Sequence, residues 1–495
     1  MSTFLLGIDI GTSACKAALF REDGALVASA DSAYAVQYPH PGWAQQDPEA
    51  WWQGAVNAVR QLLEASHVPA KEIAGIGVDG QSWSMVPLAG DGAVLYPSPI
   101  WTDCRAREEC EDMRRAAGEE ALFACSGNPV QPSYTLPKVL WLKKHEPELY
   151  RKTACVLQSN GYIVYRLTGE RTQDTSQGYG WNCFDMRRGA WNRELAVDLG
   201  VDPRLLPEIC ECSQIVGRVT AASAAATGLF EGTPVVAGGL DAACSTLGVG
   251  VIEAGQTQEQ GGQAGGMSIC MDRYAADPAL ILSRHVVPER WLLQGGTAGG
   301  GGALKWLREQ MCPELSFDDL SRLAGQAAPG SEGVVFLPFM AGERSPLWNP
   351  DAKGVLFGLS FAASRAQIVR AVMEGVAFSL RHNLEVAEAA GSRINVLRAT
   401  GGSSQSAVWM QMKADITGCR IEIPQSVTAT ARGAAILAGM GAGVYHSWRE
   451  AVHPISVTCQ YEPDANLADV YQKQYEMYRR LIDAMLPVMK RQEDH

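Results

Sequence analysis

Twice along its length the chain runs an apolar strand into a glycine-bearing turn and out into a second strand. In the first copy, at residues 4–30, Gly11-Thr12-Ser13 separates the first two of three predicted strands. In the second, at residues 257–271, the turn begins Gly261-Gly262-Gln263-Ala264. Because helices are mixed with strands around both copies, the pattern predicts an α/β architecture in two related halves. We place the division between residues 1–248 and 249–495.

Two helices have well-marked starts in the sequence. Asp47-Pro48 is a favourable N-cap and first helical residue, and apolar residues recur at helical spacing from Trp51 onward. In the second half Ser364 and Gln367 form a capping box before an apolar stripe that runs to Leu384. These segments are the most strongly patterned helices of the chain.

Composition narrows the classes of function. The 54 acidic against 42 basic side chains give a net charge of −12, which argues against nucleic acid as a partner. No apolar run approaches the roughly 18 residues of a membrane span, so we expect no membrane partner. Thirteen scattered cysteines without a Cys-x-x-Cys pair are typical of free thiols in a reducing compartment. We therefore expect a cytoplasmic protein.

The first glycine turn carries the groups of a phosphate site. Backbone N–H groups of Gly11, Thr12 and Ser13 can converge on an anion, because glycine permits positive φ and has no Cβ. Lys16 adds a positive charge nearby. Asp9 would face the same anion from the end of the strand, which implies an intervening Mg²⁺. The alternative is an ordinary β-hairpin in which Asp9 caps the turn, and the motif alone does not separate the two.

Asp241 follows a buried apolar strand and two glycines, at the first turn of a predicted helix. The helix dipole favours an ionised carboxylate there. Such a carboxylate at a domain junction can accept the proton of a hydroxyl that attacks a γ-phosphate. The alternative is a plain N-cap, a position that Asp fills readily. A third glycine turn, Gly401-Gly402-Ser403, leads from a strand into a helix and is a further candidate nucleotide seat.

In their order along the chain these motifs resemble those of the FGGY carbohydrate kinases, which share a superfold with actin, hexokinase and Hsp70. The opening Gly7-Ile8-Asp9-Ile10-Gly11-Thr12-Ser13 is similar to the first phosphate loop of that family, and residues 133–145 and 354–374 match its signatures. The resemblance covers nearly the whole chain. It implies two actin/hexokinase-like (ribonuclease H-like) domains with a cleft between them, the sugar mostly on the first and the nucleotide mostly on the second.

The resemblance also implies a role for each motif. Asp241 would be the catalytic base, and Asp9 and Asp241 would lie at the Mg²⁺. The phosphates and the adenosine would contact Gly11, Thr12, Ser13, Gly262, Gln263, Ala264, Gly401, Gly402 and Ser403. The sugar would contact Gln81, Ser82, Trp83, Trp101, Asp103, Arg105 and Asp241. For Asp103 and Arg105 the alternative is that they simply pair with each other at the surface.

Two departures from the family pattern bear on activity and substrate. The second glycine turn has Gly262-Gln263-Ala264 where many members carry hydroxyl side chains. Trp83 and its neighbours stand where xylulokinase-like members usually place Met and His. Both departures leave more than one function open.

The expected reaction is transfer of the γ-phosphoryl group of ATP, with Mg²⁺, to a hydroxyl of a small ketose or polyol, and D-xylulose is the leading candidate. L-ribulose, glycerol and a tetritol are alternative acceptors. Two different classes of function stay open as well: a catalytically inactive sugar or nucleotide sensor, and an assembly ATPase like actin or Hsp70. The sequence leaves the oligomeric state open, and a homodimer is compatible with it.

Overall fold

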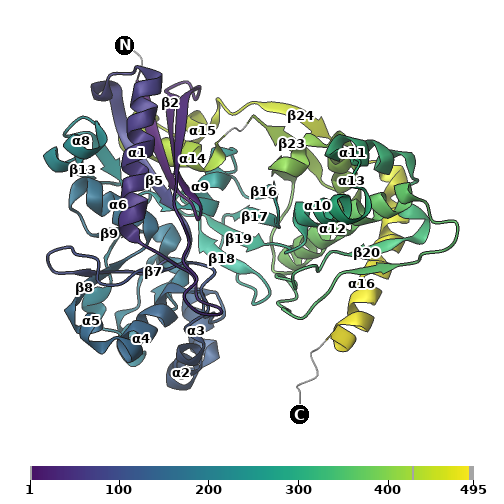
Figure 1. The fold of residues 1–495 in the computed structure, drawn as a ribbon, viewed down its shortest axis with the longest axis horizontal. Helices are drawn as coiled ribbons and strands as arrows, with labels where there is room; N and C mark the ends of the chain where they lie inside the picture. The colour runs from purple at the N-terminus through teal and green to yellow at the C-terminus, as the bar shows by residue number, and fades with distance from the viewer. Residues whose placement is uncertain (1–2, 426–427, 490–495) are drawn as a thin grey trace.

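The computed structural model describes residues 3–425 and 428–489, which form two lobes (Figure 1). Each lobe is built on a seven-stranded sheet with helices packed against it. No helix within these two ranges combines the length and the apolar character that crossing a membrane requires.

The sheet of the first lobe has the strand order β13-β14-β5-β1-β2-β3, with β15 also paired to β5. β1 pairs antiparallel with β2 across the first glycine turn and parallel with β5 on its other side. The three strands predicted at the start of the chain are confirmed. The strands of this sheet are β1 Phe4–Ile10, β2 Ala14–Arg21, β3 Leu26–Ala33, β5 Ile73–Gly80, β13 Ile215–Arg218, β14 Pro234–Val236 and β15 Gly239–Leu240.

The sheet of the second lobe has the order β18-β19-β17-β16-β22-β23-β24. β16 pairs antiparallel with β17 across the second glycine turn and parallel with β22, which is the arrangement that β1 has with β2 and β5. The two lobes thus repeat one plan. The strands of this sheet are β16 Gln256–Gly261, β17 Gly265–Met271, β18 Ile281–Arg284, β19 Trp291–Gly295, β22 Val396–Thr400, β23 Arg420–Pro424 and β24 Val457–Tyr461.

Both well-marked helices begin where the sequence predicts. In α1 (Pro48–Ser66) the N–H of Glu49 donates to the carboxyl group of Asp47, and α12 (Arg365–Ala389) has the capping box of Ser364 and Gln367. The other helices are α2 Arg107–Ala117, α3 Glu119–Ser126, α4 Thr135–His145, α5 Pro147–Lys152, α6 Ser159–Thr168, α7 Arg193–Asp198, α8 Ala221–Thr227, α9 Asp241–Gly248, α10 Gly300–Met311, α11 Phe317–Gln326, α13 Ala407–Thr417, α14 Ala429–Gly441, α15 Trp448–Val452 and α16 Ala468–Met489. Short strands outside the two main sheets are β4 Gln45–Gln46, β6 Val86–Ala89, β7 Ser98–Pro99, β8 Thr153–Leu157, β9 Thr172–Asp174, β10 Phe184–Asp185, β11 Ala190–Trp191, β12 Glu208–Cys210, β20 Val335–Leu337 and β21 Val355–Phe357.

Helix α14 comes late in the sequence but packs on the sheet of the first lobe, over β1 and β5 and beside α9 (Figure 1). Glycines in the strands make this close contact possible. A Cβ atom on Gly7 would lie 1.9 Å from the carbonyl oxygen of Ala431, and one on Gly77 would lie 2.0 Å from that of Ala434. The backbone of α14 therefore rests directly on the strands and joins the two halves of the chain.

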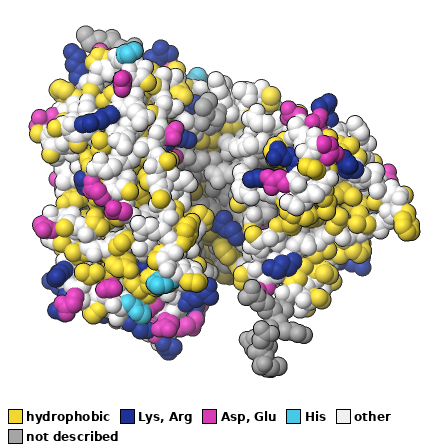
Figure 2. Space-filling model, viewed as in Figure 1, with side chains coloured by type: hydrophobic (Ala, Val, Ile, Leu, Met, Phe, Trp, Pro, Cys, Tyr) yellow, Lys and Arg dark blue, Asp and Glu magenta, His cyan; other side chains and the backbone are white. Residues whose placement is uncertain are grey.

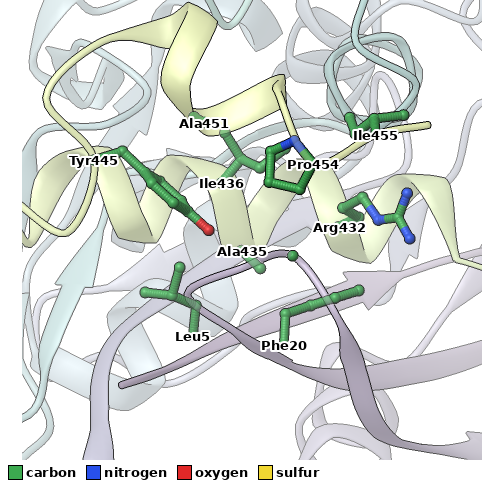
Figure 3. A pocket seen from close by; sticks show the side chains of 10 residues that line it. Leu5, Phe20, Arg432, Ala435, Ile436, Tyr445, Ala451, Pro454 and Ile455 are labelled. Atoms are coloured by element: carbon green, nitrogen blue, oxygen red, sulfur yellow. The ribbon is translucent and has the colours of Figure 1, made fainter. Parts of the chain in front are cut away.

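Beside this contact lies a small cavity of about 20 Å³. Figure 3 shows Leu5 and Phe20 of the first sheet on one side of it, and Ile436 and Tyr445 on the other. The guanidinium carbon of Arg432 lies 5.7 Å from the centre of the Phe20 ring. Because this volume suits about one water molecule, we regard the cavity as a packing gap under α14.

Candidate active site

Three neighbouring strands of the first sheet bring a carboxyl group each to one place. Asp9 on β1 is paired in register with Asp79 on β5, and β15 pairs with β5 at the same residue through Gly239. β15 leads directly into Asp241, the first residue of α9. The two carboxylates singled out in the sequence, Asp9 and Asp241, are thereby brought together. Asp79, to which no sequence motif pointed, is the third member of the group.

The turn into Asp241 depends on a glycine. Gly238 has a φ of +83°, and a Cβ atom there would lie 1.9 Å from the carbonyl oxygen of Val78. Leu240 occupies the N-cap position of α9, so Asp241 does not serve as the N-cap. Among the described residues, its side chain accepts one hydrogen bond, from the N–H of Ala242 at 2.6 Å. The rest of the carboxyl group is free to meet a ligand.

The carboxyl groups are hard to ionise where they stand. Removal from water, followed by the charge of Asp9, raises the pKa of Asp241 to about 7. Burial raises the pKa of Asp79 well above its usual value, and the charges of Asp9 and Asp241 raise it further. Burial also raises the pKa of Asp9, although contact with Asp79 and the charge of Lys16 act in the opposite direction. The site is therefore a concentration of negative charge that a cation or a proton would relieve.

Asp79 is fully buried, and within residues 3–425 and 428–489 no N–H or O–H group donates to either of its carboxyl oxygens. Its side chain lies within hydrogen-bond reach of Asp9. A proton on one of the two groups, or a cation between them, would relieve the repulsion at this contact. Asp79 is thus a neighbour of Asp9 that can take up or release a proton.

The donor set at this point is compatible with Mg²⁺. Protein sites for this ion use one or two carboxylates, with water and substrate phosphates completing the octahedron. Asp9 is half-buried at the first glycine turn, and the oxygens of Asp79 beside it lack a protein donor within the described ranges. Within those ranges no group of three or more His, Cys, Asp or Glu side chains is arranged so that it could hold a metal ion.

Two of the predicted sugar-side segments meet the first glycine turn at Thr12. The indole N–H of Trp101 donates to Thr12 Oγ1 at 2.9 Å, and that hydroxyl donates to Gln81 Oε1 at 3.4 Å. The amide of Gln46 donates to the carbonyl oxygen of Thr12 at 2.8 Å. The expected phosphate side and the expected sugar side therefore share an edge. Ser13 and Lys16 are exposed at this edge.

Ser82 and Trp83 belong to an aromatic wall next to Asp241. The Trp83 ring packs against Tyr134 at 4.7 Å and Tyr179 at 5.2 Å between ring centroids, and the Tyr179 hydroxyl donates to Ser82 Oγ at 2.7 Å. Trp83 takes the left-handed conformation, with a φ of +57°. The charges of Asp241 and of Arg344, from the second lobe, both act on Tyr179. The wall was not foreseen, because its residues are far apart in sequence.

Asp103 and Arg105 pair with each other inside the first lobe. Their side chains are fully buried and form an ion pair at 2.8 Å, and the N–H of Ala44 donates to Asp103 at 2.6 Å. The guanidinium of Arg105 lies 3.9 Å from the centre of the Trp43 ring. Contact of both residues with the sugar stays a prediction, and their charged groups already have partners within the protein. They pair with each other, but inside the protein rather than at its surface.

The second lobe has a cavity of about 470 Å³ at the second and third glycine turns. Four predicted nucleotide residues line it: Gly262, Gln263, Gly402 and Ser403. Ala264 and Gly401 are their direct neighbours and are exposed. Side chains from α10, α11 and α13 complete the lining, among them Leu304, Lys305, Phe317 and Trp409. These were not predicted, since nothing in the sequence of their helices distinguishes them from the other residues of the same helices.

The second glycine turn lies on the amino end of α10. The N–H groups of Gly301 and Gly302 donate to the carbonyl oxygens of Gly262 and Gln263, each at 2.8 Å. A Cβ atom on Gly300 would lie 2.3 Å from the backbone of Ala264, so the helix and the turn are in direct contact. The positive end of the helix dipole thus points at the turn, as in anion sites.

The molecule is hollowed between its lobes (Figure 2). The carboxyl groups and the aromatic wall belong to the first lobe, and the cavity of about 470 Å³ belongs to the second. An acceptor on one side and a phosphorylated donor on the other can therefore meet across the gap.

Comparison with known proteins gives a consistent picture. Residues 4–248 match the N-terminal domain, and residues 275–442 the C-terminal domain, of the FGGY family of carbohydrate kinases. Xylulose kinase of Escherichia coli (strain K12) is 33% identical, over 98% of this chain and 99% of its own. L-xylulose/3-keto-L-gulonate kinase of the same organism is 30% identical over the whole of both chains. The solved xylulose kinase of Rhodospirillum rubrum has a TM-score of 0.92 at 31% identity and covers 99% of this chain and 100% of that one.

Proposed function

The chain belongs to the FGGY family of carbohydrate kinases, and from this premise we propose that it transfers the γ-phosphoryl group of ATP to D-xylulose, giving D-xylulose 5-phosphate. Similarity to a xylulose kinase at 33% identity over nearly the full length supports this acceptor. Similarity at 30% identity to a kinase that acts on L-xylulose and 3-keto-L-gulonate makes L-xylulose the second ketose to compare.

The observation that carries the proposal is that Asp241 lies close to Asp9 and to Tyr179 of the aromatic wall, on which Arg344 of the second lobe also acts. The attacking hydroxyl gives its proton to this carboxylate while its oxygen bonds to the γ-phosphorus. The bond from that phosphorus to the bridging oxygen then breaks, and ADP leaves with the electron pair. A pKa of about 7 suits a general base near neutral pH, because a sizeable fraction is ionised and the proton affinity is high.

We assign the Mg²⁺ of MgATP to Asp9, with Asp79 and Asp241 close by. When bound there, the ion would neutralise charge on the phosphate oxygens. The protein contributes the carboxylate of Asp9, which it holds at the edge of the first glycine turn. Asp79 supports it from within the sheet by holding or releasing the proton that the pair shares.

The remaining groups divide between sugar and nucleotide. We propose that Gln81, Ser82, Trp83 and Trp101 border the sugar, where polar groups fix hydroxyls and the aromatic wall excludes water. The second glycine turn lacks hydroxyl side chains at Gln263 and Ala264. Its contribution to phosphate binding would come from backbone N–H groups together with the amino end of α10.

We further propose a cytoplasmic location. Every one of the thirteen cysteines is a free thiol, and nine of them are buried. Because disulfides accumulate in oxidising compartments, this pattern favours a reducing one.

The substrate is tested by following ADP release with D-xylulose, L-xylulose, L-ribulose, glycerol and a tetritol. We expect the highest kcat/KM with D-xylulose. A higher kcat/KM for another acceptor would transfer the assignment to it, and ADP binding without turnover of any acceptor would favour a sensor.

The role of Asp241 is tested with Asp241→Asn. This change removes the proton acceptor at constant size, so phosphorylation should fall by roughly 100-fold or more. ATP binding, measured by calorimetry, should stay close to that of the wild type. Full activity in the variant would remove Asp241 from the mechanism.

A further inference from the structure

Strand β16, which leads into the second glycine turn, is buried but carries polar side chains on both faces. Gln258 on one face donates to Ser245 Oγ of α9 at 2.8 Å and accepts from Thr246 Oγ1 at 2.8 Å. Glu259 on the other face is 3% exposed and points to α13. Buried polar groups are costly unless they are paired, so this strand is held by specific partners rather than by apolar packing alone.

The partner of Glu259 is Lys413 of α13. Lys413 Nζ lies 2.5 Å from Glu259 Oε1, with side-chain exposures of 1% and 4%. The same ammonium group donates to Ser403 Oγ at 3.2 Å and lies 5.2 Å from the centre of the Trp409 ring. Ser403 and Trp409 both line the cavity of about 470 Å³. The buried charge therefore reaches two residues of the cavity without lining it.

Ser403 is in turn seated on the second glycine turn. A Cβ atom on Gly261 would lie 1.5 Å from Ser403 Oγ, so the serine hydroxyl occupies the space that any other residue at 261 would fill. The third glycine turn thus contacts the second through Ser403 Oγ. Lys413 donates a hydrogen bond to that oxygen. Lys413 is in turn held by its ion pair with Glu259, which lies two residues before Gly261.

We propose that Lys413 is a positioning residue for nucleotide binding, which holds the second and third glycine turns together through Ser403 and is itself held by Glu259. The proposal rests on the proposed function in so far as the cavity binds ADP and ATP. An ion pair needed only for folding would leave nucleotide affinity untouched once stability is restored. If Lys413 is a positioning residue, nucleotide affinity stays low in a variant whose stability has been restored.

The separation of affinity from stability is tested with four variants of the full-length protein, three of which change a buried ion pair. Lys413→Met leaves Glu259 buried without a partner, whereas Glu259→Leu with Lys413→Met replaces the pair by apolar groups, which often restores stability. Arg370→Met is the matched control. It breaks another buried ion pair of the second lobe, with Glu374 at 2.7 Å, and neither residue lines the cavity.

We measure the unfolding temperature, the Kd of ADP with Mg²⁺ by calorimetry and the KM of D-xylulose. Lys413→Met should lower the unfolding temperature and weaken ADP binding roughly tenfold, as expected for loss of a charged hydrogen bond, with the KM of the sugar unchanged. The double variant should regain the unfolding temperature and keep the weak ADP binding. Arg370→Met should lower the unfolding temperature alone.

Ser403→Ala should reproduce the weak ADP binding with little loss of stability. Recovery of ADP affinity in the double variant, or equal loss of affinity in Arg370→Met, would overturn the proposal. ADP binding needs no sugar, so a wild-type protein that phosphorylates no acceptor but shows this pattern would refute the proposed function alone. A wild-type protein that does not bind ADP would refute both.

Discussion

At the scale of single residues, the proposed site contains three carboxyl groups whose negative charges repel one another. Asp9, Asp79 and Asp241 are brought to one place by the pairing of β5 with β1 and β15. Their mutual repulsion and their distance from water keep protons on them at a pH where exposed carboxyl groups are ionised. Both activity and stability should therefore depend on pH.

The pH dependence of activity follows from Asp241. Because its pKa is raised to about 7, the carboxyl group is mostly protonated at pH 6 and cannot accept the hydroxyl proton. We expect kcat/KM to rise roughly tenfold per pH unit below 7 and to level off above it. A steady-state profile from pH 5.5 to 8.5 measures this, and a flat profile would contradict the role of Asp241.

The pH dependence of stability follows from Asp79, whose pKa burial raises well above its usual value. The folded protein then keeps a proton that the unfolded chain loses near pH 4, so stability falls as pH rises toward the folded pKa. Asp79→Asn removes this penalty. We expect it to be more stable than the wild type at pH 8.

This gain should shrink as the pH is lowered to 5, and thermal unfolding without nucleotide or metal measures it. The control is Asp23→Asn, since Asp23 is exposed and Arg21 lowers its pKa. That change should not stabilise the protein at any of these pH values. An Asp79→Asn variant less stable than the wild type at pH 8 would show that the carboxyl pair is not strained.

How far the site can be predicted from the sequence depends on how local its residues are. The glycine turns and Asp241 are marked by their neighbours, so they can be found in one sequence. Asp79 lies next to the end of strand β5, and no neighbour in the sequence marks it as part of the carboxyl group cluster. Lys413 pairs with a residue 154 positions away. Asp103 and Arg105 carry the right groups for a sugar but use them on each other. Only the fold reveals such pairings.

At the scale of elements, the contact between α14 and the first sheet determines how the halves are joined. Starts of helices such as α1 and α12 are predictable, because capping involves residues three positions apart or fewer. The packing of α14 on β1 and β5 cannot be predicted in this way, because it joins residues more than 350 positions apart in the sequence. In the sequence, Gly7 and Gly77 are simply glycines within apolar strands, and nothing indicates that a helix packs against them.

A prediction at this scale concerns Gly77. In Gly77→Ala the added Cβ would lie 2.0 Å from the carbonyl oxygen of Ala434, so α14 must shift. We expect a loss of about 1–3 kcal/mol, typical of overpacking, measured as a lower midpoint of denaturant unfolding. The control is Gly90→Ala, because nothing lies within 4 Å of the added atom there. Equal midpoints for the two variants would mean that α14 adjusts freely.

At the scale of the whole molecule, the proposed acceptor and donor sites belong to different lobes. We propose the division between residues 248 and 249, since α9 ends at Gly248 and β16, the first strand of the second sheet, begins at Gln256. Asp241 and the aromatic wall lie before this division, and the cavity lined by Gly262, Gly402 and Ser403 lies after it. We therefore expect the lobes to approach each other during the proposed reaction.

This separation predicts slow hydrolysis of ATP in the absence of sugar. If the acceptor drives closure, water rarely meets ATP in a complete site. We expect the ATPase rate without sugar to be roughly 100-fold or more below the kinase rate, and D-xylulose to reduce the radius of gyration in X-ray scattering. A sugar-independent ATPase of comparable rate would show that the site is complete without the acceptor.

The position of α14 also has a consequence for biosynthesis. A ribosome makes the strands of the first sheet early, but residues 429–441, which cover them, emerge only after most of the 495 residues have been joined. Synthesis proceeds at roughly 5–20 residues per second. The surface of β1 and β5 that α14 later covers is therefore exposed in the nascent chain for tens of seconds. Chaperones should therefore engage the growing polypeptide at this surface until translation is nearly finished.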